Sequence, residues 1–226
     1  MNVRRRRLLQ TGVASAISVL LSRSSQETIA RSVITLDDHV LSAGRLIFRG
    51  TRSTEGRVVR WFDRQNEFTH VGILTDASDT VDGWAVVHAT PDHNHVSREP
   101  LTAFLKAPGI FSAAVFGWNL PAFAREADLA AQASQWIGIP FDADFAWDNG
   151  AVYCTELVWK AAQALSWVHQ PRTSLLRTPW GTREVLLISD LLSQLPIQRL
   201  QGPSDDTPHN PSRSHSARVG PLWFMV

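Results

Sequence analysis

Cys154 is the only cysteine among the 226 residues and lies in the stretch AVYCTELVWKAAQAL. A lone cysteine cannot form a disulfide within its own chain, so its thiol is a buried apolar group, a ligand or a nucleophile. Leu157, Ala161 and Leu165 recur at helical spacing, which predicts a helix with the cysteine at or just before its start. Backbone N–H groups and the helix dipole favour a negative charge there, so this position lowers the pKa of the thiol and favours nucleophilic attack.

A nucleophilic thiol needs a base, and the base needs a third group that orients it. The chain has eight histidines, and two of them lie in predicted strands: His70 in FTHVGIL and His88 in AVVHATP. A histidine in an otherwise apolar strand costs free energy when it is buried unless a partner satisfies it. Either one alone is explained as a structural histidine, but the two together, ahead of the helix that follows Cys154, indicate a catalytic group.

Short apolar runs bounded by turn residues predict strands over residues 44–50, 68–76, 84–91 and 112–120. A short helix is expected around 58–62 and a longer one over 121–138. The helix that follows Cys154 comes next, after a turn-rich loop with aromatic residues, and REVLLISDLLSQL predicts a strand that leads into a short helix. Strands followed by helices in this order indicate an α+β domain.

The two ends of the chain differ from its centre. The segment RRRRLLQTGVASAISVLL joins a basic run to an apolar stretch, so residues 1–30 are predicted to be an export signal that resembles the twin-arginine type. A basic helix at the membrane surface or an uncleaved anchor is the alternative. Residues 35–200 are predicted to form the main domain, and 201–226 a mostly disordered tail. Export would place the protein in the periplasm or envelope, where a lone thiol needs a reason to persist.

Seven blocks of the sequence resemble the permuted papain-like cysteine hydrolases, the YiiX-like relatives of the NlpC-type peptidases. In chain order they are LIFRG, FTHVGIL, VVHATP, VSREPLTAFL, PFDADFAW, YCTELVW and ISDLL. The resemblance covers roughly residues 40–200. It implies a circularly permuted papain-like α+β fold, in which an antiparallel sheet packs on the helix that carries the cysteine.

The resemblance also implies residue roles: Cys154 as the nucleophile and His70 as the general base. His88 falls at the orienting position, where better-known members have Glu. A neutral imidazole does not stabilise an imidazolium as a carboxylate does. Tyr153 is expected to line the oxyanion or substrate pocket, or else to be a packed aromatic residue. Glu156 matches the family block and is expected in the same pocket, although a carboxylate at that place also simply complements the helix dipole.

A second departure from the family is Arg45, since relatives usually read Gly-Asp before the first apolar run. The implied activity is hydrolysis of an amide or ester bond through an acyl-enzyme, with no cofactor, on a cell-wall peptide or a lipid-type substrate. An acyltransferase shares the first half of that reaction. The formal net charge of +1 gives no reason to expect nucleic-acid binding, whereas export would bring the protein close to membrane or envelope.

Two other functions compete with this one. Zinc binding would use residue types that commonly hold that metal, although their spacing fits no familiar pattern: His70, His88, His93, His95 and Cys154. A catalytically inactive module would bind lipid or acyl chains in an aromatic groove formed by Phe141, Phe145, Trp147 and Trp159. Core packing explains Trp159, on the helix, at least as well as the groove does. In the inactive module, Cys154 would be an inert buried thiol.

Overall fold

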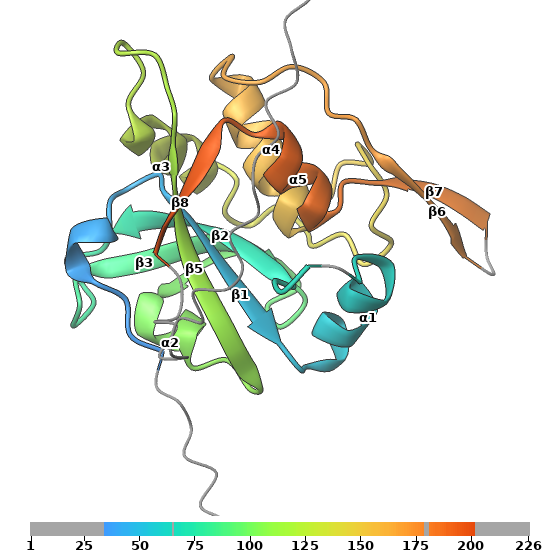
Figure 1. Ribbon diagram of the computed structural model, residues 1–226, viewed down its shortest axis with the longest axis horizontal. Helices are drawn as coiled ribbons and strands as arrows, with labels where there is room; N and C mark the ends of the chain where they lie inside the picture. Colours follow the sequence, from blue (N-terminus) through green and yellow to red (C-terminus); the bar gives the residue numbers. More distant parts are fainter. Residues whose placement is uncertain (1–33, 65, 179–180, 202–226) are drawn as a thin grey trace, which may run out of the picture. The chain divides into compact units, whose positions relative to one another are not determined.

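A computed structural model describes residues 34–64, 66–178 and 181–201 of the chain. Its central sheet has the strand order β4-β3-β2-β1-β5-β8, and neighbouring strands run antiparallel (Figure 1). The strands expected over 44–50, 68–76, 84–91 and 112–120 are confirmed as β1, β2, β3 and β5. The sheet strands are β1 (Leu46–Thr51), β2 (His70–Asp76), β3 (Trp84–Thr90), β4 (His95–Pro100), β5 (Ile110–Trp118) and β8 (Ile197–Gln201).

The predicted helix after the cysteine is confirmed and begins at Cys154 itself. The helix expected over 121–138 is shorter, because residues 121–124 form a turn and Arg125 has an extended backbone. The predicted strand and helix near 183–195 are present as β7 and α5. The helices are α1 (Thr54–Phe62), α2 (Leu101–Leu105), α3 (Glu126–Ser134), α4 (Cys154–Ala164) and α5 (Ile188–Gln194), and β6 (Ser174–Thr178) pairs with β7 (Gly181–Val185).

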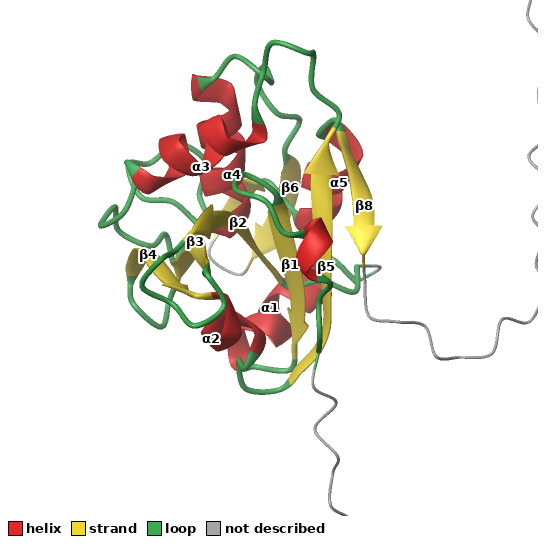
Figure 2. Ribbon diagram, turned by 90° about the vertical axis from the view of Figure 1, so that its left-hand side faces the viewer, coloured by secondary structure: helices red, strands yellow, loops and turns green. Residues whose placement is uncertain are grey.

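Successive side chains of a strand point to opposite faces of a sheet, and the two faces of this one bury different clusters. One face packs on α3 and α4 (Figure 2) and contributes residues such as Phe48, Val71 and Val87. The hydrophobic cluster on the other face is smaller, and α2 covers that face with Leu101 and Phe104. The sheet therefore packs on the helix that begins with the cysteine, as the family resemblance implies.

The turn before β1 holds the start of α3. Gly44 has φ +88°, and a Cβ there would overlap the carbonyl oxygen of Glu126, so glycine is required at this close approach. Arg45 donates from Nε to the Glu126 carboxylate over 2.9 Å. The same carboxylate accepts the Trp118 backbone N–H over 2.7 Å. The arginine that departs from the family pattern thus links β1, β5 and α3.

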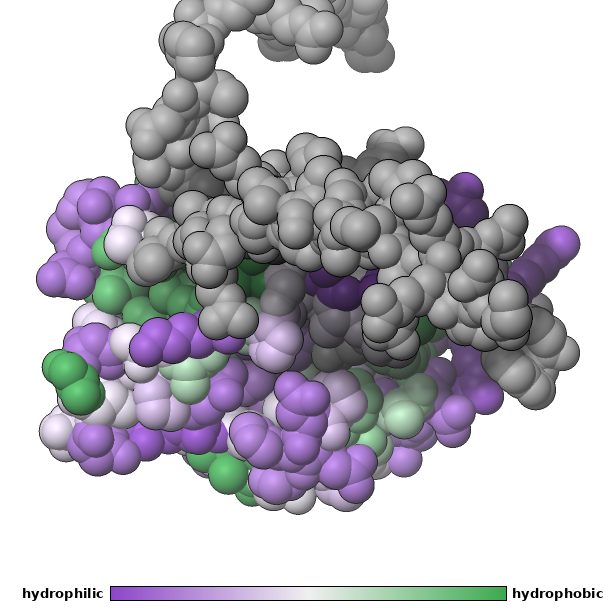
Figure 3. All heavy atoms as spheres, turned by 90° about the horizontal axis from the view of Figure 1, so that it is seen from below, coloured by the Kyte–Doolittle hydropathy of each residue, from purple (hydrophilic) through white to green (hydrophobic). Residues whose placement is uncertain are grey.

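Both predicted end segments, 1–30 and 201–226, lie outside the described residues except for Gln201, which ends β8. Within the described part of the chain, no helix is long and apolar enough to cross a membrane. Figure 3 shows the face seen from below, where hydrophilic residues predominate and hydrophobic ones form separate patches.

Candidate active site

Cys154 is the first residue of α4 and is 6% exposed. The first hydrogen bond of the helix runs from the Leu157 N–H to the Tyr153 carbonyl over 2.9 Å. The N–H groups of residues 154–156 therefore precede the first N–H that donates within the helix, and they lie at the positive end of the helix dipole. This is the environment that the sequence predicted for the thiol.

The two neighbours of Cys154 hold the same residue, Leu186, in the segment between β7 and α5. The Tyr153 hydroxyl accepts the Leu186 N–H over 2.8 Å, and the Thr155 hydroxyl donates to the Leu186 carbonyl over 2.6 Å. All three residues are buried. Burial raises the pKa of Tyr153, although the bond from Leu186 acts in the opposite direction. The phenol is therefore a neutral clamp that fixes the thiol against residues 185–188.

A strained loop leads into α4 and is held by Asp142. The carboxylate of this buried residue accepts the N–H groups of Asp144 over 2.8 Å and of Ala146 over 2.6 Å. Phe145, between them, has φ 53°, a left-handed conformation that is unfavourable for an aromatic residue. Its ring lies 5.5 Å from that of Tyr153. The loop thus places Phe145 beside the start of the helix.

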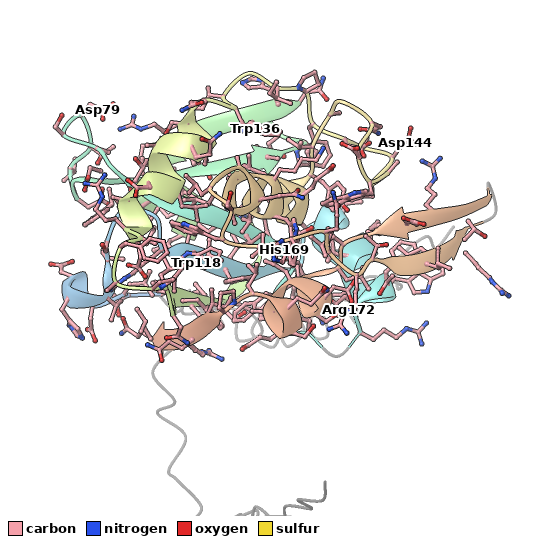
Figure 4. All side chains as sticks on the ribbon, turned by 90° about the horizontal axis from the view of Figure 1, so that it is seen from above. Asp79, Trp118, Trp136, Asp144, His169 and Arg172 are labelled. Atoms are coloured by element: carbon pink, nitrogen blue, oxygen red, sulfur yellow. The ribbon has the colours of Figure 1, made fainter. Side chains whose placement is uncertain are left out.

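An apolar cavity of about 390 Å³ opens beside the thiol. Its walls come from α1, the loop before α4, the start of α4, the β6–β7 hairpin and the start of α5. Figure 4 labels Asp144 on the loop, facing the hairpin, and Arg183 of the hairpin donates to its carbonyl over 3.2 Å. The lining residues include Val58, Val59, Trp61, Phe62, Phe145, Tyr153, Cys154, Leu176, Val185 and Leu186.

The expected aromatic groove differs from this cavity. Of its four residues, Phe145 lines the cavity, whereas Phe141 is 8% exposed and packs in the core. Trp159 is buried and donates from Nε1 to the His169 carbonyl over 2.9 Å. Trp147 lies 5.6 Å from the Lys160 ammonium, measured to the ring centroid. Helical spacing and loop composition could not show that the other walls come from α1 and the hairpin.

His70 and His88 meet on adjacent strands. Nε2 of His70 lies 2.8 Å from Nδ1 of His88, and the side chains are 2% and 1% exposed as whole residues. Both rings lie within 6 Å of the Phe104 ring, so they project on the face that α2 covers. The helix that begins with Cys154 packs on the same two strands from the other face, and Figure 1 shows one of its ends close to β2.

The structure adds a carboxylate to the pair. Nε2 of His88 lies 3.1 Å from Oε1 of Glu99, at ion-pair distance but without the alignment of an ideal hydrogen bond. Nη1 of Arg49 lies 3.7 Å from the same oxygen and donates to the Phe104 carbonyl over 2.8 Å. Thus one cluster, buried except for the half-buried Glu99, joins β1, β2, β3, β4 and α2.

Burial and charge keep both imidazoles of this cluster neutral at pH 7. Burial, followed by repulsion from the Arg49 charge and from a protonated His88, holds the pKa of His70 well below its ordinary value of 6.5. Burial also lowers the pKa of His88, although the Glu99 contact opposes this. For Glu99, burial raises the pKa, but the contacts with His88 and Arg49 outweigh it and the pKa lies below 4.5. The cluster therefore combines two neutral rings with a carboxylate.

Glu156 lies apart from the cavity lining. It is fully buried, accepts the Asp148 N–H over 3.0 Å and pairs with Lys160 over 2.9 Å. Burial raises its pKa, and the Lys160 hydrogen bond opposes that rise. These contacts agree with a structural role, in which the carboxylate ties the loop to the first turn of α4.

The other histidines named as potential zinc ligands lie in the turn between β3 and β4. His93 contacts the Ser97 hydroxyl over 2.7 Å, and its ring centroid is 6.1 Å from that of His95. Among the residues that the structure describes, no group of three or more His, Cys, Asp or Glu side chains is placed to hold a metal ion.

Sequence reasoning missed Glu99 because it missed β4. The polar DHNH stretch carries no strand pattern, yet it leads into a strand whose register pairs Glu99 with Val86. One signal was available: Glu99 precedes Pro100, and a residue before proline is biased toward an extended backbone. Paired residues share a face, so Glu99 points to the same side of the sheet as Val86 and His88.

Comparison with known proteins agrees with this architecture. The family model described as permuted papain-like amidase enzyme, YaeF/YiiX, C92 family, matches residues 40–180. A crystal structure of yiiX from Escherichia coli O157:H7, described as a metalloprotein, is similar with a TM-score of 0.58 and 18% sequence identity. The match covers 71% of this chain and 97% of that chain. No curated protein sequence matches. With an antiparallel sheet packed on the helix that begins at the cysteine and the two strand histidines, the chain belongs to the YaeF/YiiX family of permuted papain-like amidases.

Proposed function

We propose that the protein is a cysteine hydrolase that cleaves an amide or ester bond through an acyl-enzyme on Cys154. The observation that carries this proposal is the contact of 2.8 Å between two neutral, buried histidines on strands that α4 packs against. Family membership supports an amidase activity. The assignment of Cys154 as nucleophile and His70 as base rests on their chemistry and on their positions at the first residues of α4 and β2.

The proposed reaction begins with transfer of the thiol proton to Nδ1 of His70, because Nε2 of that ring is engaged by His88. The ring projects on the face opposite α4, so we place this transfer at the end of β2, where His70 is the first residue of the strand. The thiolate attacks the substrate carbonyl carbon, and the backbone N–H of Cys154 stabilises the oxyanion at the helix start. His70 then returns its proton to the leaving nitrogen or oxygen. Water attacks the acyl-enzyme to regenerate the thiol, and another nucleophile in its place would make the protein an acyltransferase.

The cavity beside the thiol favours a substrate with an apolar acyl or side-chain group next to the scissile carbonyl. Its lining from α1, Phe145 and the hairpin is dominated by aliphatic and aromatic residues. A volume of about 390 Å³ lies within the range of small-molecule sites. A lipid-type ester or amide, or a peptide with an apolar residue at that point, meets this requirement.

Acyl-enzyme trapping tests the proposal. The full chain is incubated briefly with p-nitrophenyl acetate and, separately, with p-nitrophenyl octanoate, quenched in acid and analysed by intact-protein and peptide mass spectrometry. We expect acylation on the peptide that contains Cys154, faster with octanoate, and none in Cys154→Ala. Octanoylation at other residues alone, at the same rate in Cys154→Ala, contradicts the proposal.

A second candidate function is a catalytically inactive module that binds lipid or acyl chains, and the apolar lining of the cavity favours it. A comparison of fatty-acid binding with acylation of Cys154 distinguishes the two candidates. An inactive module binds a fluorescent fatty acid in displaceable fashion yet shows no acylation of Cys154, whereas a hydrolase shows both. Leu176→Arg places a charge in the lining and is expected to weaken binding in either case.

We also propose that the protein is exported to the periplasm or envelope, close to membrane and cell-wall substrates. The basic run and apolar stretch within residues 1–30 support this. Fractionation of cells that express the full chain, compared with a chain in which Arg5 and Arg6 are both changed to Lys, provides the test. Equal recovery of both proteins from the cytoplasm contradicts export through a twin-arginine route.

A further inference from the structure

We propose that Glu99 is a positioning residue of the reaction, which acts through His88 to keep Nδ1 of His70 unprotonated. This inference rests on the proposed role of His70 as the general base. Glu99 does not touch the thiol or the substrate site. Its effect would pass through two side-chain contacts, of 3.1 Å to His88 and of 2.8 Å from His88 to His70.

The first contact fixes the proton of His88. An ionised carboxylate only accepts hydrogen bonds, and Glu99 Oε1 lies 3.1 Å from Nε2 of His88. The tautomer with the proton on Nε2 places an N–H beside the carboxylate, whereas the other tautomer places a lone pair beside it. The second arrangement is repulsive, and within a buried cluster it costs more than it would in water. The neutral His88 ring therefore carries its proton on Nε2.

The second contact, between His88 and His70, determines the tautomer of His70. With its proton on Nε2, His88 presents an unprotonated Nδ1, which can only accept. Nε2 of His70 lies 2.8 Å away and must donate across that distance. The single ring proton of neutral His70 is then on Nε2, and Nδ1 carries a lone pair. If the proton of His88 moved to Nδ1, the chain would reverse and Nδ1 of His70 would be blocked.

Arg49 and α2 hold the carboxylate in place. The Arg49 guanidinium lies over the Phe104 ring, 4.1 Å from its centroid, and 3.7 Å from Glu99 Oε1. The charged and titratable groups around His88 are thus Arg49 on β1, His70 on β2, Glu99 on β4 and His93 in the turn before β4. Of these, Glu99 alone is an acceptor that stays negative at neutral pH.

The arrangement balances charge during the proton transfer. The S–H bond of Cys154 breaks and an N–H bond forms at Nδ1 of His70, which leaves a thiolate and an imidazolium. The imidazolium keeps its hydrogen bond from Nε2 to His88, and the negative charge of Glu99 lies one ring farther along. A carboxylate at that distance supplies the stabilisation that a neutral His88 lacks by itself.

Histidine tautomers provide a direct test that does not depend on activity. Long-range ¹H–¹⁵N correlation spectra of the natural protein at neutral pH, assigned with His70→Gln and His88→Gln, show which nitrogen of each ring carries the proton. We expect Nε2–H for both rings, and a change or mixture of tautomers in Glu99→Gln, because an amide can either donate or accept. Nδ1–H on His70 in the natural protein, or unchanged tautomers in Glu99→Gln, overturns the proposal.

Thiol reactivity provides the functional test. The rate of Cys154 alkylation by iodoacetamide is measured against pH in the natural protein, Glu99→Gln and Glu99→Asp. Below the midpoint of the pH profile of alkylation, we expect Glu99→Gln to react about tenfold more slowly than the natural protein. A rise of about one pH unit in the thiol pKa lowers the thiolate fraction by that factor. Glu99→Asp, which keeps the charge, should recover part of the rate. An unchanged pH profile in Glu99→Gln contradicts the proposal.

A matched control removes a carboxylate that pairs with the residue next to Glu99. Asp79 is exposed and pairs with Arg98 over 2.8 Å, so Asp79→Asn should leave tautomers and alkylation unchanged. Failure of the proposed function is a separate result. In that case Cys154 of the natural protein alkylates like an ordinary thiol and His70→Gln has no effect, and the tautomer measurement alone decides the role of Glu99.

Discussion

Replacement of Tyr153 by Phe should destabilise the protein measurably, because the Tyr153 hydroxyl is the acceptor for a buried backbone N–H. The bond from Leu186 is 2.8 Å long, and Tyr153 and Leu186 are 2% and 1% exposed. Phe fills nearly the same volume, so the main loss is the hydrogen bond rather than packing. An unsatisfied buried donor costs about 1–3 kcal/mol.

The assay is urea unfolding followed by tryptophan fluorescence. We expect the free energy of unfolding of Tyr153→Phe to fall by about 1–3 kcal/mol. Thr173→Val is a suitable control, since the Thr173 hydroxyl makes an exposed contact of 3.4 Å with Glu184, and surface changes of this kind usually stay within about 0.5 kcal/mol.

Thr155→Val extends the experiment to a double-mutant cycle. Thr155 holds the carbonyl of the same residue, Leu186, over 2.6 Å, so the two losses should not add. A change below about 0.5 kcal/mol in Tyr153→Phe would refute the clamp between the start of α4 and residues 185–188. Strict additivity in the double variant would show that the two bonds act independently.

Three further predictions follow from buried groups. Burial holds the pKa of His70 and of His88 below 6.5, so the unfolded chain binds more protons below that pH. The free energy of unfolding should be highest above about pH 6.5 and should fall as the pH drops from there toward the lower pKa values that the two histidines have in the folded protein. Urea unfolding at pH 7.5 and 5.5 checks this, and equal stability at both pH values in the natural protein contradicts it. Lys160→Met leaves the buried Glu156 carboxylate without its cation and should lower the free energy of unfolding by about 3 kcal/mol, whereas a double variant that also carries Glu156→Leu should recover much of the loss. Gly72→Ala adds a Cβ that lies 3.2 Å from Cβ of His88 and overlaps a Val86 methyl, so acylation should slow while circular dichroism stays native; a natural acylation rate would argue against tight strand packing at this point.

The helix at Cys154 could be predicted from sequence because its apolar residues keep the 3.6-residue period without interruption. Polar His70 and His88 stood out for the opposite reason, since they break apolar strands. Both signals are local. The short strand β4 has neither, because it is mostly polar and ends at Pro100. Its carboxylate at Glu99 becomes visible only when the register places it beside His88.

The cavity beside the thiol could not be predicted for a related reason. Its walls combine α1 with the β6–β7 hairpin, which lie more than 100 residues apart in the sequence. The short helix predicted around residues 58–62 contains Trp61, but its pattern does not show that this side chain is 66% exposed and lies at the cavity. The position of Trp159 on the helix fitted either the groove or the core, and the structure buries it in the core. Only tertiary packing decides which aromatic residues face a cavity and which fill the interior.

The most direct test of the central claim is the pH dependence of Cys154 alkylation by iodoacetamide in the natural protein and in His70→Ala. We predict a thiol that titrates well below the unperturbed pKa of about 8.5 in the natural protein and near that value in His70→Ala. This result would establish a thiolate and imidazolium pair. An ordinary midpoint in both proteins, or an unreactive thiol in both, would contradict the assignment of Cys154 as a nucleophile activated by His70.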